Sequence, residues 1–140
     1  MIVLDASAAV ALLVDSGTVG GEVAARLLQH EIAYPSLLPY ELASALRRLA
    51  ASEVITPQLA ARSLHDVTLL NGQAFEFAEL ASRVWELRRN LSTYDASYIA
   101  LAELLDVPLL TLDWRLRGAP GSRCQFVDLP TPNPGPDGVA

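Results

Sequence analysis

The sequence has 140 residues, of which 51% are hydrophobic, and carries a formal net charge of −6 with no lysine. This length allows one domain with a buried core and no disulfide or metal staple, and the apolar content fits either an alanine-rich helical protein or one with apolar interfaces. The negative charge disfavours indiscriminate nucleic-acid binding, and the lack of lysine excludes a phosphate-binding-loop lysine or Schiff-base chemistry.

Short apolar runs alternate with helical patterns along the first half of the chain. The run Ile2–Leu4 predicts a buried strand, and the pattern over 8–14 predicts a helix that ends at a turn. The pattern then predicts a helix, a strand and two helices, at about 19–29, 32–34, 36–51 and 57–71. The last of these helices begins with a capping threonine followed by Pro57, which suits the first helical position.

The second half of the chain continues the alternation and ends in a segment of different composition. The expected elements are a strand within 73–77, a helix reaching 89, a break at 90–93, a helix to 105, and strands at 109–112 and 125–127. Residues 129–140 are rich in proline and glycine, a composition that cannot close a core. We therefore predict one domain over 1–128 and a disordered tail over 129–140.

Strands that alternate with helices indicate βαβ units. The sequence therefore predicts an α/β fold, in which a mainly parallel sheet of about five short strands is flanked by helices on both faces. The single cysteine, Cys124, cannot form a disulfide within the chain, and this favours a cytoplasmic protein.

Three aspartates lie where helices are expected to begin. Asp5 and Asp113 each follow a predicted strand and precede a helix, where an ordinary N-cap is a sufficient explanation. Asp95 lies in the first turn of its helix, where Ser92 or Thr93 can cap and an acid suits the helix dipole. Taken singly, none of the three requires more than a capping role.

Glu41 is different, because it falls on the apolar side of its predicted helix, three residues after Leu38 and four before Ala45. A carboxylate on the core-facing side should be paired, protonated or bound to a metal, since burying a lone charge is costly. Arg47 and Arg48 are poorly placed as ion-pair partners, because one helical heptad separates side chains by about 10 Å along the axis.

The topology of a parallel sheet would bring all four acids to one edge. Ligands of such sheets bind beyond the carboxyl ends of the strands, where the following helices also begin. Two carboxylates about 5 Å apart repel by roughly 3 kcal/mol at an effective dielectric near 20, so four of them predict a bound cation. Oxygen ligands without histidine or cysteine select Mg²⁺ or Mn²⁺, and water held by such an ion can attack phosphorus.

Four stretches of the chain resemble those of the PIN-domain ribonucleases, specifically the VapC toxins of VapBC toxin–antitoxin modules. They are residues 2–8, 39–46, 91–102 and 109–116, and each contains one of the acids. Each fragment alone is weak, but together they occur in the family's order and cover nearly the whole chain except the tail.

The resemblance implies a catalytic and metal-binding quartet of acids: Asp5, Glu41, Asp95 and Asp113. Ser7 matches a small hydroxyl residue that would orient a carboxylate or a water of the metal. Thr111 matches a position shortly before the fourth acid and would be a partner of the metal-binding residues without binding the metal itself. Arg115 matches a recurring basic residue that could meet a phosphate, although solvation at the surface explains it equally well.

The resemblance also implies function and partners. The activity would be hydrolysis of RNA, leaving a 5′-phosphate and a 3′-hydroxyl, by a toxin that a cognate VapB-type antitoxin inhibits. The assembly would be a homodimer and a toxin–antitoxin hetero-oligomer. Trp85, Trp114 and Tyr40 are candidates for such interfaces, and core positions explain them equally well.

Two other classes of protein compete with this interpretation. One is another carboxylate-metal phosphohydrolase or a phospho-accepting receiver domain. A receiver needs a lysine that this chain lacks, and an Asp-x-Asp phosphatase needs an acid where Ser7 stands. The other is a catalytically inactive PIN-fold protein that only binds a partner, against which the complete quartet argues.

Overall fold

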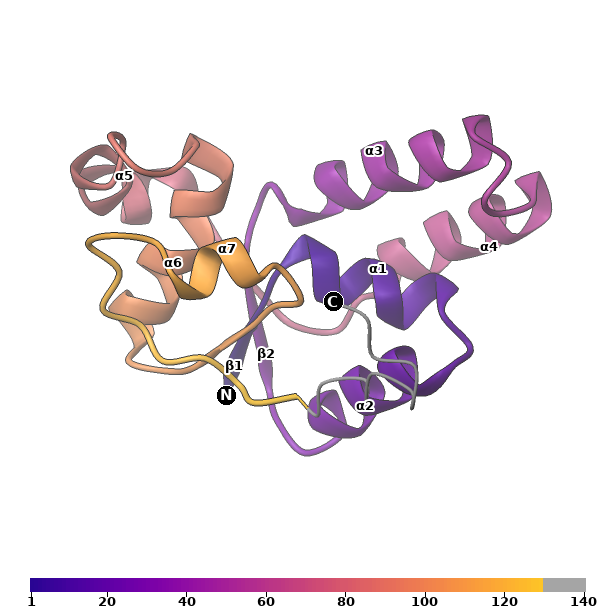
Figure 1. The fold of residues 1–140 in the computed structure, drawn as a ribbon, viewed down its shortest axis with the longest axis horizontal. Coiled ribbons are helices and arrows are strands. Elements are labelled where there is room, and N and C mark those ends of the chain that lie inside the picture. The colour runs from indigo at the N-terminus through magenta and orange to yellow at the C-terminus, as the bar shows by residue number, and fades with distance from the viewer. Residues whose placement is uncertain (130–140) are drawn as a thin grey trace, which may run out of the picture.

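A parallel sheet forms the centre of the computed structural model, which describes residues 1–129 (Figure 1). Its strands are β1 (Ile2–Leu4), β2 (Ile32–Pro35), β3 (Gln73–Phe75) and β4 (Leu109–Leu110). They lie in the order β3-β2-β1-β4, and every neighbouring pair is parallel. The predicted disordered tail lies outside the described residues, apart from Leu129.

Helices connect and cover these strands. They are α1 (Ala6–Val14), α2 (Thr18–Leu27), α3 (Leu38–Ala51), α4 (Pro57–Thr68), α5 (Phe77–Glu86), α6 (Thr93–Leu105) and α7 (Trp114–Arg117). Figure 1 shows α5, α6 and α7 on one side of β1 and β2, and α1 to α4 on the other. The predicted α/β fold is therefore confirmed. Within residues 1–129, no single helix is long and apolar enough to cross a bilayer.

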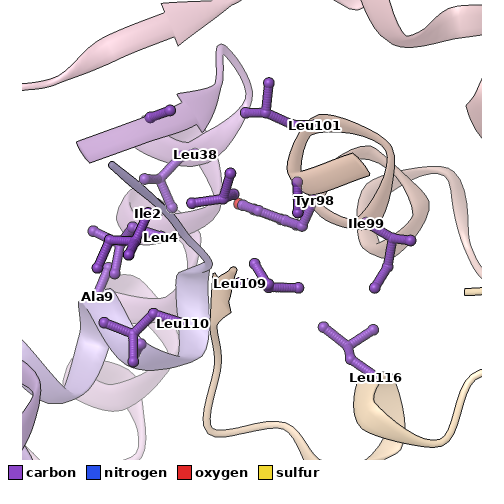
Figure 2. Packing of buried hydrophobic residues seen from close by; sticks show 14 of the residues in the cluster. Ile2, Leu4, Ala9, Leu38, Tyr98, Ile99, Leu101, Leu109, Leu110 and Leu116 are labelled. Carbon is purple, nitrogen blue, oxygen red and sulfur yellow. The ribbon is translucent and has the colours of Figure 1, made fainter. Parts of the chain in front are cut away.

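Helix α6 is the most deeply buried of the helices. Every residue from 96 to 102 is buried, and the helix contacts β1, β2, β4 and α5. Its sequence explains this position, because alanines alternate with Ile99 and Leu101 and allow close packing on two sides. Figure 2 shows these two side chains together with Leu109 of β4 in the core. Helix α6 ends at Asp106, which adopts a left-handed conformation with φ of 52°.

The expected fifth strand is wrong, because the segment 125–127 makes only an isolated parallel bridge between Phe126 and Leu109. The Leu109 amide donates to Gln125 O at 2.8 Å, and the Val127 amide donates to Leu109 O at 2.9 Å. Pairing extends no further because β4 itself stops at Leu110. After that residue the chain turns toward α1, where side chains rather than a neighbouring strand bind its amides.

The strand order also determines where a ligand should bind. The chain runs outward from β1 through β2 to β3, and then returns to place β4 on the opposite side of β1. The strand order therefore reverses between β1 and β4. In open parallel sheets, the crevice at the carboxyl ends of such a pair is the usual ligand site.

A tight corner joins α1 to α2. The Asp15 carboxylate accepts the backbone amides of Gly17 at 2.8 Å and Gly20 at 2.9 Å. These hydrogen bonds lower the pKa of Asp15. Gly20 lies so close to the preceding helix that a Cβ atom there would stand 2.1 Å from the Asp15 carbonyl oxygen. The corner thus depends on a residue without a side chain.

A group of charged side chains attaches the loop after α7 to the body of the protein. Arg83 on α5 donates from Nε to Glu103 Oε2 at 2.6 Å, and from Nη2 to both Glu103 Oε1 and the Gly121 carbonyl. Glu103, on α6, also accepts the Arg123 backbone amide at 2.7 Å. The Glu103 side chain is only 10% exposed, so these contacts are partly shielded from water.

We expect Glu103→Gln to lower the free energy of unfolding at pH 7 by about 1.5–3 kcal/mol, the contribution of hydrogen bonds to a charged group. Burial raises the pKa of Glu103, but the hydrogen bonds from Arg83 and Arg123 outweigh it and lower that pKa below its usual value. A depressed carboxyl pKa stabilises the fold above the unfolded-state pKa, and this stability is lost as the pH falls through the folded value.

Urea denaturation at pH 7 and at pH 3 would check this expectation. The difference in the free energy of unfolding between the wild type and Glu103→Gln should be smaller at pH 3 than at pH 7. Glu53→Gln is the matched control, because Glu53 is exposed and should show little difference at either pH. A destabilisation of Glu103→Gln that is the same at both pH values would contradict this account.

Candidate active site

Asp5 lies at the carboxyl end of β1, the position where the strand order predicts a ligand site. It follows β1, caps the amino end of α1, and is 4% exposed. Its Oδ1 atom accepts the Ser7 hydroxyl at 2.6 Å and the Ala8 amide at 3.1 Å, while Oδ2 accepts the Thr111 hydroxyl at 2.6 Å. The capping role is therefore real, but two further donors are aimed at the same carboxylate.

Ser7 and Thr111 join the end of β1 to the end of β4. Ser7 Oγ accepts the Leu112 amide at 2.9 Å, and Thr111 Oγ1 accepts the Asp113 amide at 3.0 Å. Because each hydroxyl oxygen accepts from the backbone, its own proton is free to point at Asp5. Ser7 therefore contacts Asp5, and Thr111 contacts both Asp5 and the Asp113 amide.

Opposing effects act on the protonation of Asp5. Burial raises its pKa above the ordinary value, and the hydrogen bonds from Ser7, Thr111 and the Ala8 amide act in the opposite direction. All of these groups donate to the carboxylate and therefore favour its ionised form, against the larger effect of burial. A nearby cation would relieve the cost of this buried charge.

Glu41 lies in the first turn of α3 and is half-buried. Its Oε1 atom accepts the Tyr98 hydroxyl at 2.7 Å. Burial raises the pKa of Glu41, and the negative charges of Asp95 and Asp5 raise it further. Among residues 1–129 no ion pair involves Glu41, so a salt bridge to Arg47 or Arg48 does not explain its position.

Asp95 and Asp113 complete the expected quartet in different ways. Asp95 lies in the first turn of α6, where Ser92 Oγ accepts its amide at 3.1 Å, and its charge acts on Glu41. Asp113 caps α7 and is held by Arg115, whose Nε and Nη2 atoms donate to Oδ1 at 3.0 Å and Oδ2 at 2.7 Å. This contact lowers the pKa of Asp113.

The structure thus places Asp5 and Asp95 within electrostatic reach of Glu41, while Asp113 is neutralised by its own neighbour. Across the described part of the chain, no three acidic, histidine or cysteine side chains stand close enough to share an ion in these conformations. The donors nevertheless fit a hard divalent cation in chemistry, because carboxylates and hydroxyls offer only oxygen. Repulsion that already raises the Glu41 pKa would be relieved by positive charge.

Sequence reasoning missed one residue of this site and left others undecided. Tyr98 was not expected to contact an acid, although it lies three residues after Asp95 and therefore on the same side of α6. Trp85, Trp114 and Tyr40 are 68%, 78% and 79% exposed, so the alternative that they belong to the core is wrong.

Comparisons with known proteins agree with this fold. Residues 2–121 match the PIN domain family. Ribonuclease VapC9 of Mycobacterium tuberculosis is 40% identical over 130 residues, which are 93% of this chain and 99% of that protein. The crystal structure of PAE2754 from Pyrobaculum aerophilum is 28% identical, with a TM-score of 0.60 over 82% of this chain and 76% of that one. VapBC2 from Rickettsia felis, bound to a DNA fragment from their promoter, is 17% identical and shares the fold, with a TM-score of 0.64 over 91% and 98% of the two chains.

Proposed function

Because this chain belongs to the PIN-domain family and is similar to VapC ribonucleases over almost its whole length, we propose that it is the ribonuclease toxin of a toxin–antitoxin pair. It hydrolyses phosphodiester bonds of RNA and depends on a divalent metal ion. The observation that carries this proposal is the buried Asp5 carboxylate, which Ser7 and Thr111 hold beside the charges of Glu41 and Asp95.

Each acid has a defined part in this proposal. Asp5, Glu41 and Asp95 hold the cation, and Asp113 joins them when Arg115 releases it. A divalent ion held by these carboxylates would neutralise their charge and would supply Lewis-acid activation of the phosphate and of a water. Ser7 and Thr111 keep the Asp5 oxygens in place, so the carboxylate does not have to reorganise during the reaction.

Arg115 is suited to meet the substrate. Its side chain is 71% exposed, and its only ion pair in the described residues is with Asp113, two positions away in sequence. Such an exposed pair contributes little to stability, of the order of 0–1 kcal/mol, and is therefore easily exchanged. A planar guanidinium also binds a phosphate through two donors at once. We place the RNA backbone against this side chain.

Mg²⁺ is the proposed ion, with Mn²⁺ as a substitute, because both favour oxygen ligands. The proposed protein partners are a VapB-type antitoxin and a second copy of the chain. What supports them is the exposure of three large apolar side chains, Leu28, Tyr40 and Trp114, each of which is more than three-quarters exposed. Large apolar groups in water are typical of interaction sites. A cytoplasmic location follows from cellular RNA as the substrate.

We expect the purified protein, freed of antitoxin, to cleave RNA when Mg²⁺ or Mn²⁺ is supplied and to stop when excess chelator is added. Incubation with a mixture of cellular RNAs, followed by mapping of the new ends, measures this. Restoring the metal should restore cleavage, and adding the cognate antitoxin should arrest it. Cleavage that persists in excess chelator would refute the metal-dependent mechanism.

The same experiment separates an enzyme from a protein that only binds a partner. A catalytically inactive PIN-fold protein would bind the antitoxin and cleave nothing under any metal condition. Replacing Asp95 with asparagine distinguishes a contaminating nuclease from this chain, because only the activity of this chain should disappear. The acid lies at the helix start, where asparagine is a neutral change for the fold.

A further inference from the structure

We propose that Tyr98 is a positioning residue that holds Glu41 in the orientation in which it binds the cation. The hydroxyl of Tyr98 donates to Glu41 Oε1 at 2.7 Å, across the 57 positions that separate the two residues in sequence. This inference rests on the proposed function, because Glu41 is given a role in holding the metal there. It adds a residue to the site that carries no charge and touches no substrate.

The ring of Tyr98 makes this hydrogen bond rigid. The residue is 2% exposed and belongs to the hydrophobic core. Figure 2 shows its ring extending from α6 toward Leu38, with the oxygen at the far end. A tyrosine has two side-chain torsions, and burial in the close-packed core restricts both of them. The hydroxyl is therefore held at a defined place in the fold.

Glu41, by contrast, has a flexible side chain at a half-buried position on α3. Three torsions separate its carboxylate from the backbone, and ordering such a chain costs up to about 1.5–2 kcal/mol. The hydrogen bond from Tyr98 fixes one oxygen and so leaves Oε2 pointing in a defined direction. Without it, the carboxylate would be free to turn toward solvent, away from Asp5 and Asp95.

Helix α6 therefore supports the site twice. It supplies Asp95 from its first turn, and one turn later it supplies Tyr98 on the same side of the helix. Any shift of α6 would move Asp95 and the support of Glu41 together, so the relative positions of these two acids are maintained. Burial also raises the pKa of the Tyr98 phenol, which keeps its hydroxyl a donor.

The test is Tyr98→Phe, which removes only the hydroxyl. We expect its affinity for Mn²⁺, measured by calorimetric titration of the whole protein, to fall about tenfold to a hundredfold, the usual effect of losing a partner of a metal ligand. The turnover number for RNA should fall while the Michaelis constant stays near that of the wild type. Tyr94→Phe is the matched control on the same helix. Tyr94 is 61% exposed, and removal of its hydroxyl should change neither the Mn²⁺ affinity nor the turnover number.

A double-mutant cycle separates positioning from a general effect on the fold. In a Glu41→Gln background, Tyr98→Phe should weaken Mn²⁺ binding no further, because its effect passes through the Glu41 carboxylate. Additive losses would overturn the inference, as would Mn²⁺ affinity of Tyr98→Phe within twofold of the wild type. A wild-type protein that binds no Mn²⁺ would overturn the proposed function as well, so the two failures are distinguishable.

Discussion

Asp5→Asn should lower the rate of RNA cleavage by more than about a hundredfold and leave the protein folded. Mutation of a residue that only hydrogen-bonds to a metal ligand typically lowers activity about 10–100-fold, so mutation of a ligand itself should lower it further. Asparagine caps a helix about as well as aspartate, so the Ala8 amide keeps an acceptor. The change also removes a buried charge whose pKa burial has raised, so we expect stability to change by less than about 1 kcal/mol.

Cleavage assays and thermal denaturation of the same preparation would measure both effects. Asp66→Asn provides the matched control, because it replaces the same carboxylate with the same amide at an exposed position on α4. It should alter neither cleavage nor stability. The assignment of Asp5 would fail if Asp5→Asn kept more than about a tenth of the activity, or if its activity disappeared only because the protein had unfolded.

Gly20→Ala should destabilise the protein by about 2–3 kcal/mol, the typical effect of forcing an extra methyl into a packed position. The added carbon would stand 2.1 Å from the Asp15 carbonyl oxygen and 2.9 Å from the Ala11 carbonyl oxygen, and backbone atoms cannot yield as a flexible side chain does. The corner between α1 and α2 would have to open, and the hydrogen bond from the Gly20 amide to Asp15 would be strained. The expected fall in melting temperature is roughly 6–12 °C.

Gly21→Ala is the control for helix propensity. The neighbouring position has nothing within 4 Å of an added Cβ atom, so alanine there should leave the stability unchanged or raise it by up to about 1 kcal/mol. Calorimetric melting of both variants would distinguish the two sites. Equal stability of the two variants would show that the corner relaxes freely, and would contradict the packing argument.

The alternation of apolar runs and helical patterns was enough to predict the parallel sheet, because buried strands and amphipathic helices have different periods. It was not enough to predict where β4 ends. That boundary depends on hydrogen bonds from the Leu112 amide to Ser7 and from Thr111 to Asp5, which join residues more than 100 positions apart. Contacts of this kind exist only once the strands are side by side.

The same limit applies to the site. The placement of Asp5 at a strand end and of Glu41 on an apolar helix face could be predicted, because each is a local property of its element. The partner of Glu41 could not, since Tyr98 comes from another helix and looks like an ordinary core residue in its own pattern. The pairing of Asp113 with Arg115 was missed for another reason: Arg115 was considered for a phosphate and not for its neighbour.

The direction of β1 has a practical consequence for handling the protein. Met1 precedes the strand and Asp5 follows it, so the length of the strand, about 10 Å for three residues, separates the amino terminus from the carboxylates. Both neighbouring strands run the same way and present their amino ends near Met1. A fluorophore attached at Met1 would therefore project from the edge of the sheet opposite to the proposed active site.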